Sequence, residues 1–290
     1  MTESELQQQR AQLWRLDGNP VRTIEDARSF IEAAGFCLMY PVRALPLAPT
    51  FMGAFIGSAD GLPDTKHAFA DPRAQEATDL MVRLLRERSA FEIRLLPDTN
   101  LIVSAPLFPF FYALLSDRNP KAVPRTKAQG AQVSYLAGQV FAAIQEHGPA
   151  TKNQLRELLG GESSDAALDR ALGELWSILK IIRVSYTSSE GAAWDVLYRW
   201  AAEAVKEGLA ISAPEAISAL LSKYLEVVIA ATQEEIEHFF SHLVPRSKVR
   251  EAINALLAAR ELSFVVVGAR TLIQMAPVVE PSHDRKRAHG

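Results

Sequence analysis

Apolar and polar positions in the second half of the chain follow a helical period that occurs twice. Thr151 and Thr232 each open a run in which apolar residues fall three and four positions apart, as on one face of a helix. Gln154 and Glu235 stand three residues after these threonines. This T-x-x-Q/E spacing is the capping box, which satisfies free amide groups at a helix start. The sequence therefore predicts two short capped helices, 232 − 151 = 81 residues apart.

The same offset of 81 also aligns the apolar positions on either side of the capped helices. The upstream pairs are Leu136 with Ile217, Val140 with Leu221, and Ile144 with Leu225. The downstream pairs are Leu168 with Val249, Leu172 with Ile253, Leu175 with Leu256, Trp176 with Leu257, Ile181 with Leu262, and Val184 with Val265. One ungapped shift superposes three helices and a strand, and we interpret it as duplication of a structural unit.

Each copy is predicted to contain three helices followed by two strands. In the first copy the helices span about 133–146, 151–159 and 164–179, and the strands 181–186 and 192–200. In the second copy the helices span about 213–229, 232–242 and 245–259, and the strands 262–267 and 271–276. Three helices and a β-hairpin form a winged helix, which is a helix-turn-helix with a β wing. A generic α+β repeat without helix-turn-helix geometry is the alternative.

The chain before residue 130 has a different pattern. Helices are predicted over 21–35, 72–88 and 109–117, and strands over 91–97 and 100–106. The stretch 117–130 has two prolines and little apolar character, which indicates a linker. We expect an α+β fold of tandem winged-helix repeats. Its predicted parts are an N-terminal winged-helix-like domain (1–126), two winged helices (127–205 and 206–278) and a disordered basic tail (279–290).

Composition limits the possible partners and compartments. The net charge of −3 provides no global basic field, so any nucleic-acid site must be a local patch. The single cysteine, Cys37, excludes an intrachain disulfide and lies in an apolar stretch typical of a buried side chain. The N-terminal stretch is polar, and no apolar run reaches the roughly 18 residues of a membrane span. We expect a soluble cytoplasmic protein with no membrane contact, located at the nucleoid if it binds DNA.

Candidate nucleic-acid contacts come from the third helix of each copy, because this helix enters the major groove in a helix-turn-helix. In the first copy it is acidic, with Asp165, Asp169 and Glu174 beside Ser164 and Arg170. The second copy offers Arg246, Ser247, Lys248, Arg250 and Asn254, and the linker adds Lys121, Arg125 and Lys127. Such side chains bind phosphates and base edges. We expect the second copy and the linker to bind double-stranded DNA, with a protein partner as the alternative.

A metal site is the other constellation that we considered. Glu234, His238 and His242 are spaced four residues apart and share one helix face. No fourth ligand is evident, and we expect these side chains to lie in solvent. We therefore predict no metal and no cofactor.

One N-terminal stretch resembles a known family. AGFCLMYPVRALPLAPTF (34–51), followed by a helix, a strand pair and FFYALLS, is similar to the AlkZ/YcaQ-like proteins, and looks closest to their shorter AlkZ-related branch. These are bacterial tandem winged-helix proteins that include DNA glycosylases for alkylated or crosslinked bases. The resemblance implies a role in DNA repair, with damaged duplex DNA among the partners.

The family's catalytic motif is Gln, any residue, then Gln or Asp, placed behind a glycine and two apolar residues. Gly35 and its two successors match that lead-in, so Leu38, Met39 and Tyr40 occupy the motif. Base release needs an amide or carboxylate, which these residues lack. We therefore predict a DNA-binding relative of these glycosylases without their catalysis. An active glycosylase with an atypical site, using Glu32 or Asp26, and a protein-interaction module are the alternatives.

Overall fold

The computed structural model describes residues 1–63, 70–96, 99–130, 133–187 and 189–277. Three units share one order of elements: helix, short strand, two helices and two strands. The first unit comprises α2 (Ile24–Ala34), β1 (Phe36–Leu38), α3 (Phe51–Ile56), α4 (Pro72–Arg86), β2 (Ala90–Leu96) and β3 (Thr99–Ser104). The second comprises α6 (Tyr135–His147), β4 (Ala150–Thr151), α7 (Lys152–Leu158), α8 (Asp165–Ser177), β5 (Ile181–Thr187) and β6 (Gly191–Val196). The third comprises α11 (Ala213–Val228), β7 (Ala230–Ala231), α12 (Gln233–Phe240), α13 (Arg246–Ala258), β8 (Leu262–Val267) and β9 (Arg270–Met275).

The strand order is the same in each unit, with the last strand in the middle. The three antiparallel sheets run β1-β3-β2, β4-β6-β5 and β7-β9-β8. The α+β class is therefore confirmed, and each unit carries the helices and hairpin expected of a winged helix. The short first strand of each sheet was not predicted. The prediction of a strand over 192–200 was partly wrong, because its second half forms the helical turn α9 (Leu197–Trp200).

Both predicted capping boxes are formed. The amide of Thr151 donates to Gln154 Oε1 at 2.8 Å, and the amide of Thr232 donates to Glu235 Oε2 at 2.7 Å. The threonine hydroxyls accept from the amides of the same two partners. The local sequence signal therefore fixes where these helices begin.

Unusual backbone angles repeat with the same offset. Gly148 and Ile229, which are 229 − 148 = 81 residues apart, have φ of 92° and 68°. Leu179 and Arg260, also 260 − 179 = 81 apart, have φ of 52° and 61°. The ψ angles at Gly148 and Ile229 are −163° and −56°, so these two positions share a positive φ and not one turn conformation. The recurrence of positive φ at both pairs of positions agrees with duplication.

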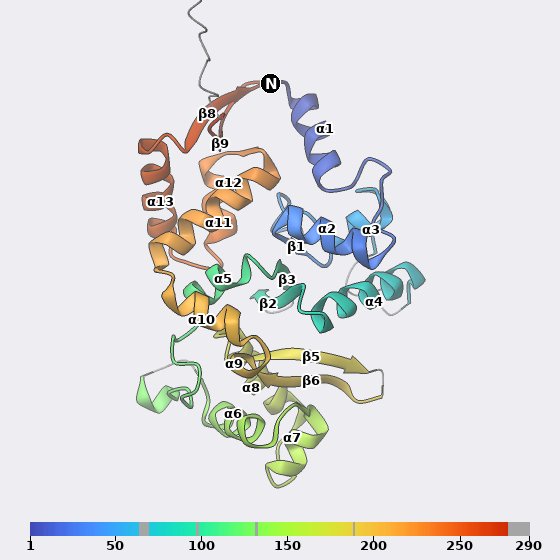
Figure 1. Ribbon diagram of the computed structural model, residues 1–290, viewed down its shortest axis with the longest axis vertical. Helices are drawn as coiled ribbons and strands as arrows, with labels where there is room; N and C mark the ends of the chain where they lie inside the picture. Colours follow the sequence, from blue (N-terminus) through green and yellow to red (C-terminus); the bar gives the residue numbers. More distant parts are fainter. Residues whose placement is uncertain (64–69, 97–98, 131–132, 188, 278–290) are drawn as a thin grey trace, which may run out of the picture.

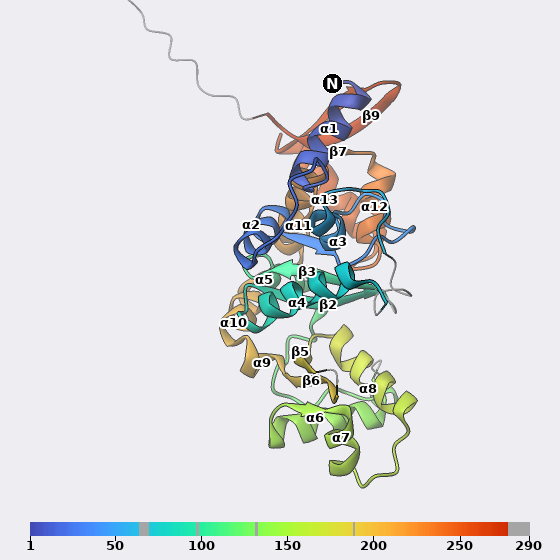
Figure 2. The same cartoon turned by 90° about the vertical axis from the view of Figure 1, so that its right-hand side faces the viewer.

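The first unit lies between the other two (Figures 1 and 2), so the two sequence copies are not adjacent to each other. Helix α1 (Glu3–Leu13) packs beside the third unit, where the buried Arg10 donates to the carbonyls of Val228 and Ala230. Helices α5 (Phe108–Leu115) and α10 (Ala202–Ala210) pack against each other at Gly208, where a Cβ would meet Tyr112. The short 3-10 helix η1 (Lys127–Gln129) lies in the predicted linker.

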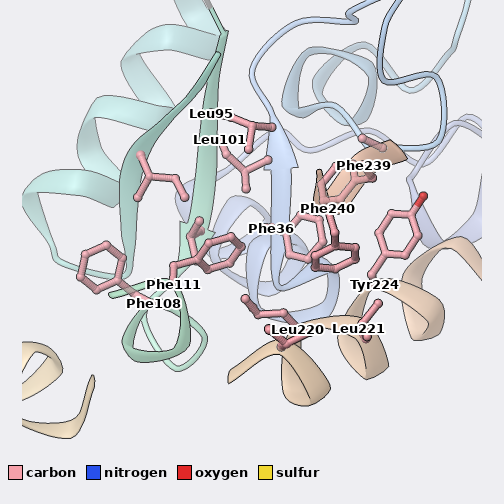
Figure 3. Close-up of a cluster of buried hydrophobic side chains, with 14 of the residues drawn as sticks. Phe36, Leu95, Leu101, Phe108, Phe111, Leu220, Leu221, Tyr224, Phe239 and Phe240 are labelled. Carbon is pink, nitrogen blue, oxygen red and sulfur yellow. The ribbon is translucent and has the colours of Figure 1, made fainter. Parts of the chain in front are cut away.

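An aromatic cluster joins the first unit to the third (Figure 3). Phe36 of β1 stacks on Tyr224 of α11 at 6.3 Å and on Phe239 of α12 at 5.5 Å between ring centroids. All three side chains are at most 2% exposed, so this junction is part of a continuous hydrophobic core. The first unit therefore packs directly against the third.

Two further predictions concern the domain boundaries and the C-terminal tail. The domain boundaries at 126/127 and 205/206 remain predictions, and the second falls inside α10. The tail at 279–290 lies outside the described residues. Among the described residues, no helix has both the length and the apolar character needed to cross a bilayer.

Candidate functional site

Helix α8, the third helix of the second unit, is turned toward the first unit at its C-terminal half. Trp176 Nε1 donates to the carbonyl of Glu92 on β2 at 3.0 Å. A Cβ at Gly173 would meet the guanidinium of Arg94, so the glycine allows this close approach. At the exposed N-terminal end, Asp165 and Asp169 form ion pairs with Lys152 and Arg156. This helix is thus partly used for packing and presents an acidic end.

Helix α13, the third helix of the third unit, is exposed along the predicted contact face. Arg246, Ser247, Lys248, Arg250 and Asn254 all lie at the surface. Arg250 is bound by Glu237 at 2.9 Å, and its hydrogen bonds hold the pKa of that carboxyl below its usual value. Lys248 pairs with Glu251 at 2.8 Å on the same helix. Within the described ranges, Arg246 has no ion-pair partner.

The three predicted linker cations are exposed, but two of them contact other side chains of the protein. Lys127 Nζ lies 3.4 Å from Glu174 Oε1, and Lys121 Nζ lies 5.9 Å from the centre of the Tyr198 ring. Arg125 is exposed. Two of the three predicted linker contacts therefore already have a partner in the protein.

Residues 38–40 lie at the end of β1, and most of this segment is packed. Leu38 is fully buried in the core shared with the third unit. Met39 is 9% exposed, and Tyr40 is half-buried and hydrogen-bonded to Thr78. Burial raises the pKa of the Tyr40 hydroxyl. Hence the segment supplies one phenol and no amide or carboxylate side chain.

A cleft of about 790 Å³ opens beside this segment. Its walls are the end of β1, helix α4, strands β2 and β3, and strand β5 of the second unit; α4 and β5 extend to the right in Figure 1. Arg83 and Arg86 lie on the exposed rim, and Arg86 bridges to β5 by donating to the carbonyl of Tyr186 at 3.4 Å. Tyr186 itself is 43% exposed at the mouth. The cleft is therefore formed between two units and has a cationic edge.

The floor of the cleft carries a buried carboxylate. Glu92 is 4% exposed, and its Oε1 accepts from Asn100 Nδ2 at 2.7 Å and from Arg183 Nη2. The guanidinium of Arg183 lies over Trp176 and Trp194, at 4.7 and 5.8 Å from their ring centres. The ion pair thus connects β2 of the first unit to β5 of the second.

Glu32 and Asp26, the substitutes considered from sequence, do not line this cleft. Asp26 accepts from the amides of Arg22 and Thr23, which lowers its pKa, and Glu32 is exposed on α2. Sequence reasoning missed Glu92 because it alternates with apolar residues on a strand, the pattern of a solvent-facing position.

A second cavity, of about 420 Å³, lies between the segment 45–47 and helix α12. Arg246 and His238 line it, and the ring of His238 makes a hydrogen bond through Nε2 to the carbonyl of Ala44 at 2.9 Å. Within the described ranges, no group of three histidine, cysteine or acidic residues is arranged to hold a metal ion. Unlike the expectation, His238 and His242 are only partly exposed.

The comparisons with known proteins agree with this architecture. The family described as "DNA glycosylase AlkZ-like" matches residues 67–289, which is most of the chain. The chain belongs to the AlkZ-like DNA glycosylase family. Its structure is similar to that of the Streptomyces sahachiroi DNA glycosylase AlkZ, with a TM-score of 0.60 and 15% identity over 95% of this chain and 70% of that chain. No curated protein matches the sequence.

These matches confirm the resemblance, and the structural likeness concerns the fold alone at this identity. The matched segment of the AlkZ-like family begins after residues 38–40. The assignment of the catalytic motif to those positions therefore remains a prediction. The cleft, in contrast, draws most of its walls from the matched segment.

Proposed function

We propose that this AlkZ-like protein binds double-stranded DNA and receives a displaced base in the cleft beside Tyr40. The observation that carries the proposal is the cleft itself, because its 790 Å³ is within the 300–1,000 Å³ typical of small-ligand pockets and exceeds the need of one base. Enzymes and binders that act on a base take it out of the stack into such a pocket. Damaged duplex is the favoured partner, because a weakly paired base costs less to displace.

Leu38, Met39 and Tyr40 take no part in base release in this proposal. Leu38 faces the core, and the thioether and the phenol cannot act as a carboxylate. The protein works in the cytoplasm, at the nucleoid while DNA is bound.

Two cationic surfaces are candidates for the phosphate contacts. One is the rim of the cleft, with Arg83 and Arg86, and the other is the predicted face of α13, with Arg246 and Lys248. The two surfaces lie on opposite sides of Figure 1. We propose that the rim guides the damaged strand, and that α13 and the linker provide additional duplex contacts.

Salt-dependent DNA binding tests this proposal. The probe is a duplex that carries 2-aminopurine opposite an abasic site. Its fluorescence anisotropy reports affinity, and the fluorescence intensity of 2-aminopurine reports displacement of the base. Each lost phosphate contact lowers the slope of log K against log salt by about 0.9. We expect Arg83→Glu with Arg86→Glu to reduce affinity and to abolish the rise in 2-aminopurine fluorescence.

Charge-reversal variants distinguish the contributions of the two surfaces to DNA binding. Arg246→Glu with Lys248→Glu should reduce affinity but keep the fluorescence rise in the DNA that still binds. Arg170→Glu with Lys206→Glu reverses two exposed charges outside both surfaces and should leave binding unchanged. Absence of DNA binding at low salt would contradict the proposal and favour the protein-interaction alternative.

A further inference from the structure

The cleft contains two carboxylates among the described residues, and they differ in burial. Asp79 lies on the exposed rim, whereas Glu92 lies on the floor with 4% of its surface exposed. A carboxylate in a water-poor floor interacts with charge more strongly than one on the rim, because the local dielectric is lower. Glu92 is therefore the acidic group that a displaced nucleotide would meet.

The two oxygens of Glu92 have different surroundings. Oε1 accepts both hydrogen bonds, from Asn100 and Arg183. Within the part of the chain that the structure describes, no hydrogen bond reaches Oε2, and this oxygen is not among the buried polar atoms that lack a partner. Among the described residues, Oε1 is thus anchored by two hydrogen bonds, and Oε2 has no hydrogen-bond partner on the wall of the cleft.

The strand register fixes the face of the sheet on which Glu92 lies. Glu92 is opposite Ile102 on β3, which in turn is opposite Cys37 on β1. Cross-strand neighbours share a face of the sheet, so Glu92, Ile102 and Cys37 lie on one face, and both Glu92 and Met39, which follows the end of β1, line the cleft. Glu92 therefore reaches, from another strand, the cleft that residues 39 and 40 border.

We propose that Glu92 is a catalytic carboxylate for base release, in place of the amide or acid that is missing at residues 38–40. The inference rests on the proposed function, because it requires a displaced base in the cleft. Arg183 is a positioning residue, since it binds Oε1 and is itself held against Trp176 and Trp194. Asn100 has the same role from β3.

The reaction is a hydrolysis and needs no cofactor. The bond between C1′ of the deoxyribose and the base nitrogen breaks, and both electrons leave with the base. A base that alkylation has made cationic leaves as a neutral molecule. Water then bonds to C1′ and gives one proton to Glu92 Oε2, which passes it to solvent. The products are the free base and an abasic deoxyribose.

The test measures single-turnover base release by the full chain from a duplex with one 7-methylguanine. Abasic sites are detected by alkali cleavage, and spontaneous release is subtracted from a sample without protein. General-base catalysis contributes about 10²- to 10⁴-fold. We expect Glu92→Gln to lower the rate at least 100-fold at unchanged DNA affinity. Glu76→Gln, the same substitution on the exposed side of α4, should stay within twofold of the wild type.

A second variant covers the case in which Glu92→Gln fails to fold. Glu92→Gln with Arg183→Gln leaves no uncompensated charge in the floor, and release should be lost there as well. In both variants the single-turnover rate should fall while DNA affinity is unchanged, a split that loss of the fold would not produce.

The outcomes distinguish this inference from the proposed function. DNA binding and base displacement without any base release by the wild type would overturn the role of Glu92 and leave the binding proposal intact. Base release that persists in Glu92→Gln would overturn it as well. Absence of DNA binding would overturn both.

Discussion

Lys180 secures the linker to the second unit, and its replacement by methionine is expected to destabilise the protein. The side chain is 1% exposed, and its Nζ lies 2.8 Å from Asp117 Oδ2. It also donates to the carbonyls of Asn119 and Ala122. Methionine has a similar volume but no donor, so Lys180→Met removes the three polar contacts and keeps the packing.

The magnitude follows from these partners. A hydrogen bond that involves a charged group contributes about 1.5–3 kcal/mol, and an unsatisfied buried carbonyl costs about 1–3 kcal/mol. Asp117 is 34% exposed and regains water, so its share is discounted. We therefore expect Lys180→Met to lower the free energy of unfolding by about 3 kcal/mol, at the lower end of the 3–5 kcal/mol for a broken buried pair.

Urea unfolding followed by tryptophan fluorescence measures this change. The chain offers a matched control, because the residue 81 positions later is Glu261, which is exposed. Glu261→Met should change stability by less than about 0.5 kcal/mol, as usual for surface substitutions. A loss below about 1 kcal/mol for Lys180→Met would refute the assigned role of the buried ammonium group.

Three further predictions follow from buried polar groups. Arg10→Met should cost about 2–3 kcal/mol in urea unfolding, since the carbonyls of Val228 and Ala230 lose a charged donor. Arg15→Met, at a partly exposed turn residue, should cost far less if this reasoning holds. Cys37 should not react with a thiol reagent in the native protein, because it is fully buried and burial raises the pKa of its thiol; rapid labelling without denaturant would contradict this. Burial, together with the nearby His238 and Arg246, lowers the pKa of His242 below its unfolded value of about 6.5. The unfolded state therefore binds more protons than the folded state, and the free energy of unfolding falls as the pH drops below that value. The wild type should therefore lose more stability between pH 7 and pH 5 than His242→Gln, and equal losses would exclude this contribution.

The fold was predictable where local signals were strong. The capped helices at Thr151 and Thr232 begin where the capping boxes place them, and the strand over 262–267 has the predicted bounds. The strands β4 and β7 were missed because two residues are too few to show a period. Helix α1 was missed because it buries little besides Leu6 and Arg10, so it has no apolar stripe.

The site was predictable to a smaller extent, because it depends on how units pack. Glu92 and Arg94 alternate with buried apolar residues on β2, which indicates a solvent-facing side for the strand. In the structure, α4 and the second unit cover that side of the strand. A local sequence pattern cannot indicate that a side chain is buried by another unit. The surface of α13 was easier to identify, since its exposed cations follow directly from helical spacing, although its role in DNA binding remains a prediction.

One position explains why equivalent helices differ in what they can contact. Gly173 of α8 corresponds to Asn254 of α13, since 254 − 173 = 81. At Gly173 the absence of a Cβ lets Arg94 and strand β2 approach the helix, and this docking places Arg183 beside Glu92. A glycine inside a helix costs about 1 kcal/mol relative to alanine, so packing is the reason to keep it. At Asn254 the side chain is exposed. The third helix of the second unit packs against β2 of the first unit, and the second unit therefore contributes a wall of the cleft. The third helix of the third unit instead presents its polar side chains at the surface.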